Sequence, residues 1–178
     1  MTASRNLKIR ADERGAAIIE LALVAPILAL MTIGIVDMSN AYSRKLALEQ
    51  GAQRAIEKIM QTTQQDTVEG TLTTEAVCQV NGLNADGTCK TSPISASNVT
   101  VTCRVDCTDP TSGSMISQVL TTSAAADAVV CGATQKTARY IQIALTDQYY
   151  PLFPIHFAEF TSSDGSYHLA AAAGMRIE

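Results

Sequence analysis

Catalytic motifs are missing from this sequence of 178 residues. It has no Gly-x-Ser-x-Gly, His-Glu-x-x-His or glycine-rich phosphate-binding motif. Its two histidines, His156 and His168, each lie between apolar or aromatic neighbours, which is more typical of packing than of catalysis. These absences argue against an enzyme, and we expect neither a cofactor nor a catalytic residue.

Basic charge is also scarce once the first fifteen residues are set aside. The remaining chain has nine Lys and Arg residues against fifteen Asp and Glu residues. A protein that binds nucleic acid usually carries an excess of basic residues on one face or in one stretch. The composition therefore predicts no nucleic-acid partner.

No charged residue occurs from Leu21 to Val36, and Glu20 immediately precedes this apolar run. As a helix, residues 16–36 would be about 31 Å long, which matches the hydrocarbon core of a bilayer. We therefore expect a membrane-spanning helix with a mild kink at Pro26. A carboxylate in such a segment is costly and usually marks a function with a partner nearby.

The residues before this run indicate how Glu20 could be used. Residues 1–15 form a short basic leader with four basic and two acidic residues, which favours a cytoplasmic position. Cleavage after Gly15 would create a new amino group at Ala16, one helical turn from Glu20, and residues 14–20 resemble the processing site of a type IV prepilin. The alternative is an ordinary secretory signal peptide cleaved near Ser39-Asn40-Ala41, but this gives Glu20 no purpose.

The helical pattern continues beyond the apolar run. Residues 37–61 carry an apolar stripe at helical spacing, with Gly51 as its weak point. The stripe consists of Leu48, Ala52, Ala55, Ile56 and Ile59. We therefore expect one helix over residues 16–61, whose outer stripe packs against the rest of the protein.

A head domain is expected after a polar, threonine-rich linker at residues 62–74. Within the head, residues 75–178, alternation predicts strands at Asn98–Asp106 and Arg139–Thr146 and a weaker one at Tyr167–Ile177. Met115–Leu120 has the spacing of a short helical turn. The fold class is thus α+β, a long transmembrane helix followed by a small extracytoplasmic antiparallel β head with disulfides.

All five cysteines lie in the expected head, where an exported location permits disulfides. Cys78 and Cys89 bracket a short interval with Asn-Gly and Asp-Gly turn signals, which predicts that they pair. Cys131 would then pair with Cys103 or Cys107, leaving one thiol free or intermolecular. Zinc is the weaker alternative, because Cys-x3-Cys with no nearby histidine is poor zinc spacing, and we expect no metal.

Aromatic residues concentrate near the C-terminus, where Tyr149–Ile155 contains two prolines. Prolines at these positions exclude a regular helix or a central strand. We expect a stiff apolar loop packed into the core under the sheet. The alternative is an exposed contact patch for another pilin-like subunit.

Two blocks of this sequence, residues 14–28 and 34–42, resemble the TadE/TadG-like pseudopilins of tight-adherence systems. The shared pattern is a glycine, a glutamate five residues later, an apolar stretch with an early proline, then Gly-Ile-Val-Asp and a nearby tyrosine. Asp37 stands where the family often has glutamate. Residues 149–154 and 175–178 also resemble the ending of these proteins, more loosely.

The resemblance implies a minor pilin-like subunit that is processed by a prepilin peptidase and assists the assembly of Flp-type pili for surface adhesion. Its expected partners are the peptidase, other pilin or pseudopilin subunits, the pilus assembly machinery and membrane lipid. Its expected location is the bacterial inner membrane, as a single-pass protein with the head outside, or the pilus itself. The alternative is an anchored extracytoplasmic binding domain with no part in a filament.

Overall fold

The fold was obtained as a computed structural model that describes residues 13–62, 68–153 and 162–177. The chain divides into two compact units, residues 1–40 and 41–178. A long N-terminal helix is followed by an antiparallel sheet, which confirms the expected α+β class.

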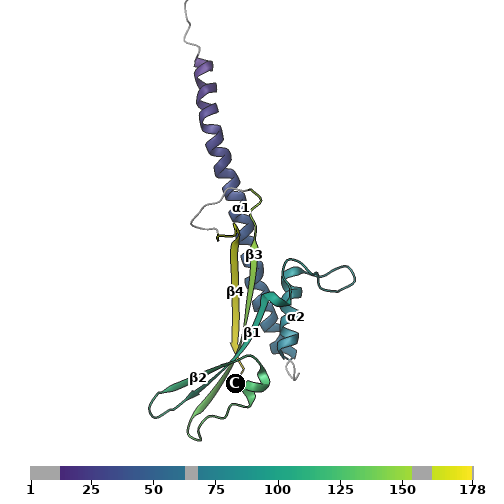
Figure 1. The fold of residues 1–178 in the computed structure, drawn as a ribbon, viewed down its shortest axis with the longest axis vertical. Helices are drawn as coiled ribbons and strands as arrows, with labels where there is room; N and C mark the ends of the chain where they lie inside the picture. Colours follow the sequence, from purple (N-terminus) through teal and green to yellow (C-terminus); the bar gives the residue numbers. More distant parts are fainter. Residues whose placement is uncertain (1–12, 63–67, 154–161, 178) are drawn as a thin grey trace, which may run out of the picture. The chain divides into compact units, whose positions relative to one another are not determined.

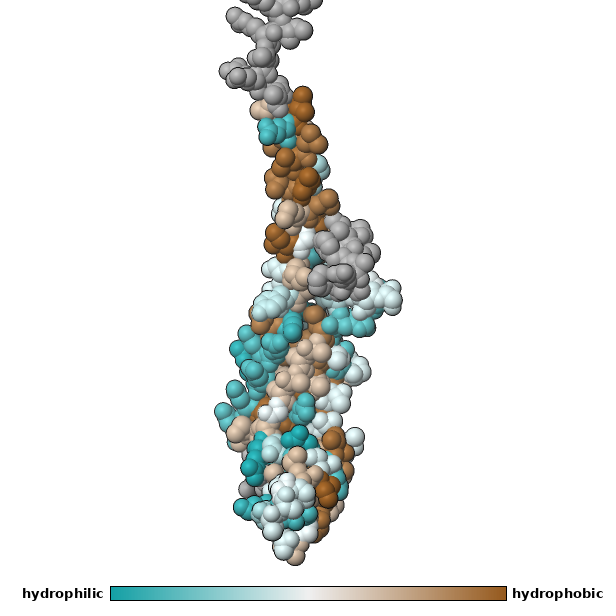
Figure 2. Space-filling view, turned by 90° about the vertical axis from the view of Figure 1, so that its left-hand side faces the viewer, coloured by the Kyte–Doolittle hydropathy of each residue, from teal (hydrophilic) through white to brown (hydrophobic). Residues whose placement is uncertain are grey.

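Helix α1, Glu13–Thr62, begins with the apolar run. In the first unit its large apolar side chains are exposed, and the face seen in Figure 2 is mostly apolar with a few hydrophilic interruptions. Pro26 lies inside the helix without ending it, and the Thr32 hydroxyl donates to the Leu28 carbonyl at 2.7 Å. By length and composition, α1 is able to cross a membrane.

The second unit is built on a four-stranded sheet with the order β2-β1-β3-β4, and every neighbouring pair is antiparallel (Figure 1). Its strands are β1, Val99–Thr108; β2, Met115–Leu120; β3, Lys136–Tyr149; and β4, Tyr167–Arg176. The described residues of this unit also form three shorter helical elements: α2, Val68–Asn81; the 3-10 helix η1, Ala96–Asn98; and α3, Ser123–Asp127.

The core lies between one face of the sheet and the helices. Alternate residues of β1 and β3, such as Val105 and Ile143, are buried there. The whole stripe expected on α1, from Leu48 to Ile59, is buried in the same cluster. The prediction that this stripe packs against the head is confirmed.

The three expected strands are confirmed as β1, β3 and β4, but the expected helical turn at Met115–Leu120 is wrong. This segment is strand β2, which pairs with β1 over six residue pairs from Cys103↔Leu120 to Thr108↔Met115. The turn between β1 and β2 is tight, with Gly113 at a φ of +70°. Pairing with the edge of β1 therefore overrides the local helical spacing.

The expected linker at residues 62–74 also needs correction. Helix α1 extends to Thr62, and residues 68–74 belong to α2. The reason is an apolar repeat every four residues: Leu72 and Ala76 are fully buried, and Val68 packs against the core. The threonines between them concealed this pattern.

The loop after β3 does not enter the core, so that expectation is wrong for its described part. β3 continues to Tyr149, and Tyr150, Leu152 and Phe153 are exposed. Leu145 is the last fully buried apolar residue of β3, so the loop begins beyond the core. Pro154 and Ile155 lie outside the described residues.

Gly51 marks a close approach between α1 and α2. A Cβ placed on Gly51 would lie 2.4 Å from Cγ2 of Val80, a separation that real Cβ atoms do not show. Gly51 is itself buried. The glycine that weakens α1 as an isolated helix is therefore the residue that lets α2 pack against it.

We expect Gly51→Ala to lower the free energy of unfolding by about 1–2 kcal/mol, because overpacking outweighs the gain in helix propensity. In a Val80→Ala background the same change should instead be stabilising, by up to about 1 kcal/mol. Urea unfolding of the full chain in detergent, followed by circular dichroism, measures both. Gly70→Ala is the matched control, since nothing lies within 4 Å of its added Cβ, and it should not destabilise.

Candidate functional site

The expected processing site lies among the first residues of α1 that the structure describes. Described residues begin at Glu13, and the backbone at Gly15 and Ala16 is helical.

Glu20 is exposed on α1 one turn beyond Ala16. Its neighbours Ile18, Ile19 and Leu21 are all exposed as well. It is the only charged residue between Ala16 and Val36. An acidic group thus sits alone on an apolar helix whose surface is left for lipid or for other helices to cover.

The structure pairs four of the five candidate cysteines. Cys78 of α2 is joined to Cys89, the expected pair, and Cys107 of β1 is joined to Cys131. Gly82 and Gly87 have positive φ, as the two turn signals between Cys78 and Cys89 require. The choice left open for Cys131 is thereby resolved in favour of Cys107.

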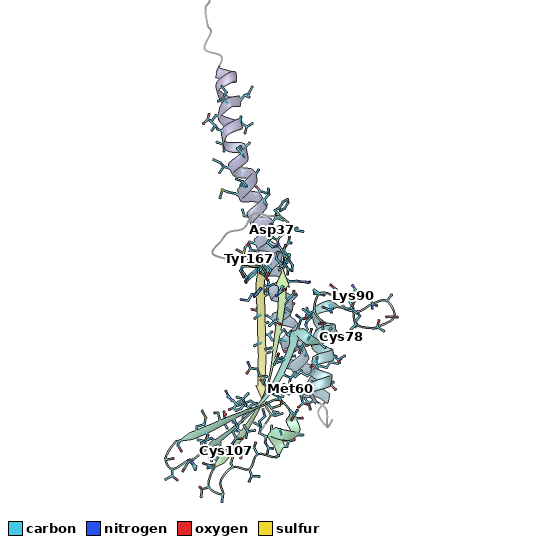
Figure 3. All side chains as sticks on the ribbon, in the orientation of Figure 1. Asp37, Met60, Cys78, Lys90, Cys107 and Tyr167 are labelled. Carbon is cyan, nitrogen blue, oxygen red and sulfur yellow. A yellow bond between two sulfur atoms is a disulfide. The ribbon has the colours of Figure 1, made fainter. Side chains whose placement is uncertain are left out.

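Asn81 holds the loop between Cys78 and Cys89 against the rest of the head through hydrogen bonds. Its side-chain amide donates to the carbonyls of Lys90 and Ile94, both at 2.7 Å, and its Oδ1 accepts from the Ile94 N–H at 3.0 Å. Figure 3 shows Cys78 and Lys90 at this end of α2. The loop is therefore held by a buried hydrogen-bond network in addition to its disulfide.

Cys103 is the unpaired cysteine, and it is buried in the core. Burial raises the pKa of its thiol, and the carboxylates of Glu69 and Asp127 raise it further. A buried thiol with a raised pKa is a poor nucleophile and a poor metal ligand. Among the described residues, no group of three or more His, Cys, Asp or Glu could hold a metal ion.

An ion pair that the sequence analysis missed lies at one end of the core. Arg44 Nε lies 3.0 Å from Oδ2 of Asp147, whose side chain is buried at the end of β3. Oδ2 has no well-aligned hydrogen bond, so the contact is mainly electrostatic, while Oδ1 accepts from the Gln148 N–H at 2.9 Å. Arg44 precedes Leu48 by four residues and so continues the α1 stripe, which was the available signal.

A second missed pair joins α1 to α2. Lys58 Nζ lies 2.5 Å from Oε2 of Glu75, and the Gln79 amide donates to Oε1 at 2.7 Å. Burial raises the pKa of Glu75, but the hydrogen bonds from Lys58 and Gln79 outweigh it and leave the pKa lowered. Glu75 is therefore held ionised between the two helices.

The part of α1 that carries Gly15, Glu20 and most of the buried stripe matches a known family. Residues 15–56 match the TadE-like protein family. The match begins at Gly15 and ends at Ile56, so it covers less than half of the chain. TadE-like proteins are generally structural and not enzymatic. No curated protein and no solved structure matches the chain.

We expect peptide mapping under non-reducing conditions to recover the Cys78–Cys89 and Cys107–Cys131 pairs. Cys103 should react with a maleimide only after unfolding, because its thiol is buried and its pKa is raised. Mass spectrometry of protein labelled before and after denaturation measures this. Labelling of Cys103 in the native protein, or its recovery in a disulfide, would contradict the assignment.

Proposed function

We propose that this chain is a minor pilin-like subunit that assists the assembly of a Flp-type, tight-adherence pilus for surface adhesion. A prepilin peptidase cleaves it between Gly15 and Ala16. The observation that carries the proposal is Glu20, the single charge on an exposed apolar helix, placed five residues after Gly15 within the TadE-like match.

The chemistry of the cleaved end supports this role. Cleavage would leave an ammonium group at Ala16, about 6 Å along the helix axis from Glu20. An unpaired carboxylate in hydrocarbon costs a few kcal/mol, so Glu20 gains by pairing with a cation. The Ala16 amine of a neighbouring subunit, offset by one turn, supplies that cation and sets the register between the two helices.

The proposed location follows from the leader and the cysteines. The positive-inside rule keeps the basic leader in the cytoplasm, and α1 then crosses the inner membrane once. The head emerges on the outer side, where disulfides such as Cys78–Cys89 persist. The subunit's partners are the peptidase, other pilin or pseudopilin subunits and the assembly machinery.

A membrane-anchored binding domain outside any filament is the alternative function. It accounts for the apolar run and for the disulfide-bonded head. It gives no role to Glu20 or to Gly15, because a simple anchor needs neither a charge nor a cleavage site. The two residues therefore separate the two functions experimentally.

The mature protein is expected to begin Ala-Ala-Ile-Ile-Glu. N-terminal sequencing of protein extracted from membranes measures this directly, and the same protein from cells lacking prepilin peptidase should begin at Met1. A wild-type start at Met1 would overturn the proposal. A start at Tyr42 would do so too, because it would identify residues 1–41 as a secretory signal.

Glu20→Ala should still be cleaved but should lose pilus assembly, or its crosslinks to partner subunits, because the Ala16 amine no longer has a carboxylate to pair with. Electron microscopy of surface pili and crosslinking in membranes measure the loss. Glu57→Ala, which removes an exposed carboxylate from the outer half of the same helix, is the matched control and should assemble normally. Normal pili from Glu20→Ala would refute the registration role.

A further inference from the structure

The loop that follows β3 exposes apolar and aromatic side chains at one end of the sheet. Tyr150 is 60% exposed, Leu152 is 68% exposed and Phe153 is 39% exposed. These three residues, which we call the β3 apron, lie within four positions of one another. Exposed apolar side chains this near one another in the chain are candidates for contact with lipid or with another protein.

The ion pair of Arg44 and Asp147 shows which part of α1 lies beside the end of the sheet that carries the apron. Asp147 is 3.0 Å from Arg44, and Tyr150 follows it by three residues. The apron is therefore at the end of the sheet that α1 reaches first as it leaves the apolar run. Tyr149 and Tyr167, which pair across β3 and β4 with ring centroids 6.3 Å apart, belong to the same end.

The distance between this end and the apolar run is limited by the chain itself. Arg44 follows Val36, the last residue of the run, by eight residues, which is about 12 Å of helix. Even a fully extended chain of that length would reach only about 29 Å. Whatever the angle at which the head is held, the chain limits how far the apron can lie from a membrane that contains the run.

The chemistry of the apron suits the boundary between lipid and water. Tyrosine is enriched at that boundary because its ring is apolar and its hydroxyl is polar. The Tyr150 hydroxyl donates to Oε1 of Gln148 at 3.4 Å, so its polar end already has a partner. The nearest acidic group on β3, Asp147, is buried and paired with Arg44, so it presents no exposed charge to the lipid.

We propose that the β3 apron docks on the outer surface of the bilayer that holds the apolar run of α1. Lipid is thus a second contact of the head, and it holds the disulfide-bonded part of the protein close to the membrane. The inference rests on the membrane anchor of the proposed function, but not on a role in a pilus.

The absence of tryptophan from this sequence provides a clean test. Full-length Leu152→Trp is reconstituted at one copy per nanodisc in phosphatidylcholine whose acyl chains are brominated close to the headgroup. Bromine quenches tryptophan only on contact. We expect a clear loss of fluorescence relative to the same protein in unbrominated lipid.

Two further variants serve as controls. Leu28→Trp, inside the apolar run, should be quenched by lipid brominated deep in its acyl chains. Val130→Trp should not be quenched, because Val130 is 90% exposed and follows α3 at the other end of the sheet, roughly 40 Å from Tyr150. Figure 3 shows Cys107 and Tyr167 at these opposite ends. Tyr150→Trp repeats the test with an aromatic replacement in case Leu152→Trp perturbs the loop.

The outcomes separate this inference from the proposed function. Quenching at Leu152 and Tyr150 but not at Val130 supports apron docking. Quenching at Leu28 with none at the apron overturns the docking and leaves the anchor intact. A blue shift that appears only in crowded vesicles, without quenching, identifies a second copy as the occupant and overturns lipid docking. No quenching at Leu28 overturns the anchor and the docking together.

Discussion

The packing of the outer part of α1 on the sheet is the constraint on which the head depends. Leu48, Ile56 and Ile59 are buried in the core, each contributing about 1.5–3 kcal/mol relative to an exposed side chain. The stripe meets alternate residues of β1 and β3, while Gly51 leaves room for α2. Removing residues 41–62 of α1 would uncover the inner face of the sheet, so this part of the helix belongs to the head.

One helix therefore carries two different surfaces. Before Val36 its apolar residues surround the helix and are exposed, as a membrane requires. After Asp37 they narrow to a stripe, as one-sided packing on a head requires. Arg44 lies where the second pattern begins, and its pairing with Asp147 aligns the helix with the end of β3. Together, the ion pair and the buried stripe fix which end of the sheet packs against the part of α1 that follows the apolar run in the sequence.

Sequence reasoning succeeded where a segment packs against one partner and its apolar residues recur at one regular helical or strand spacing. The α1 stripe and the alternation in β1 and β3 are of this kind, and so is the turn chemistry between Cys78 and Cys89. It failed where the local spacing of apolar residues is misleading or is obscured by polar residues. Met115–Leu120 has helical spacing but pairs with β1, and threonines concealed the Leu72–Ala76 repeat of α2. The Arg44–Asp147 pair was missed because each residue alone resembles a solvated surface charge, although Arg44 continues the spacing of the α1 stripe.

The boundary between the residues that match the TadE-like family and those that do not agrees with the packing of α1 on the sheet. The TadE-like match ends at Ile56, so it includes both the apolar run and most of the packing stripe, but none of the sheet. In the proposed function, assembly through Glu20 constrains residues that must meet the same groups on other subunits, and the stripe must keep a helical period. The sheet needs only to offer an apolar face to that stripe. Its strands, disulfides and β3 apron are therefore where the protein can acquire contacts of its own.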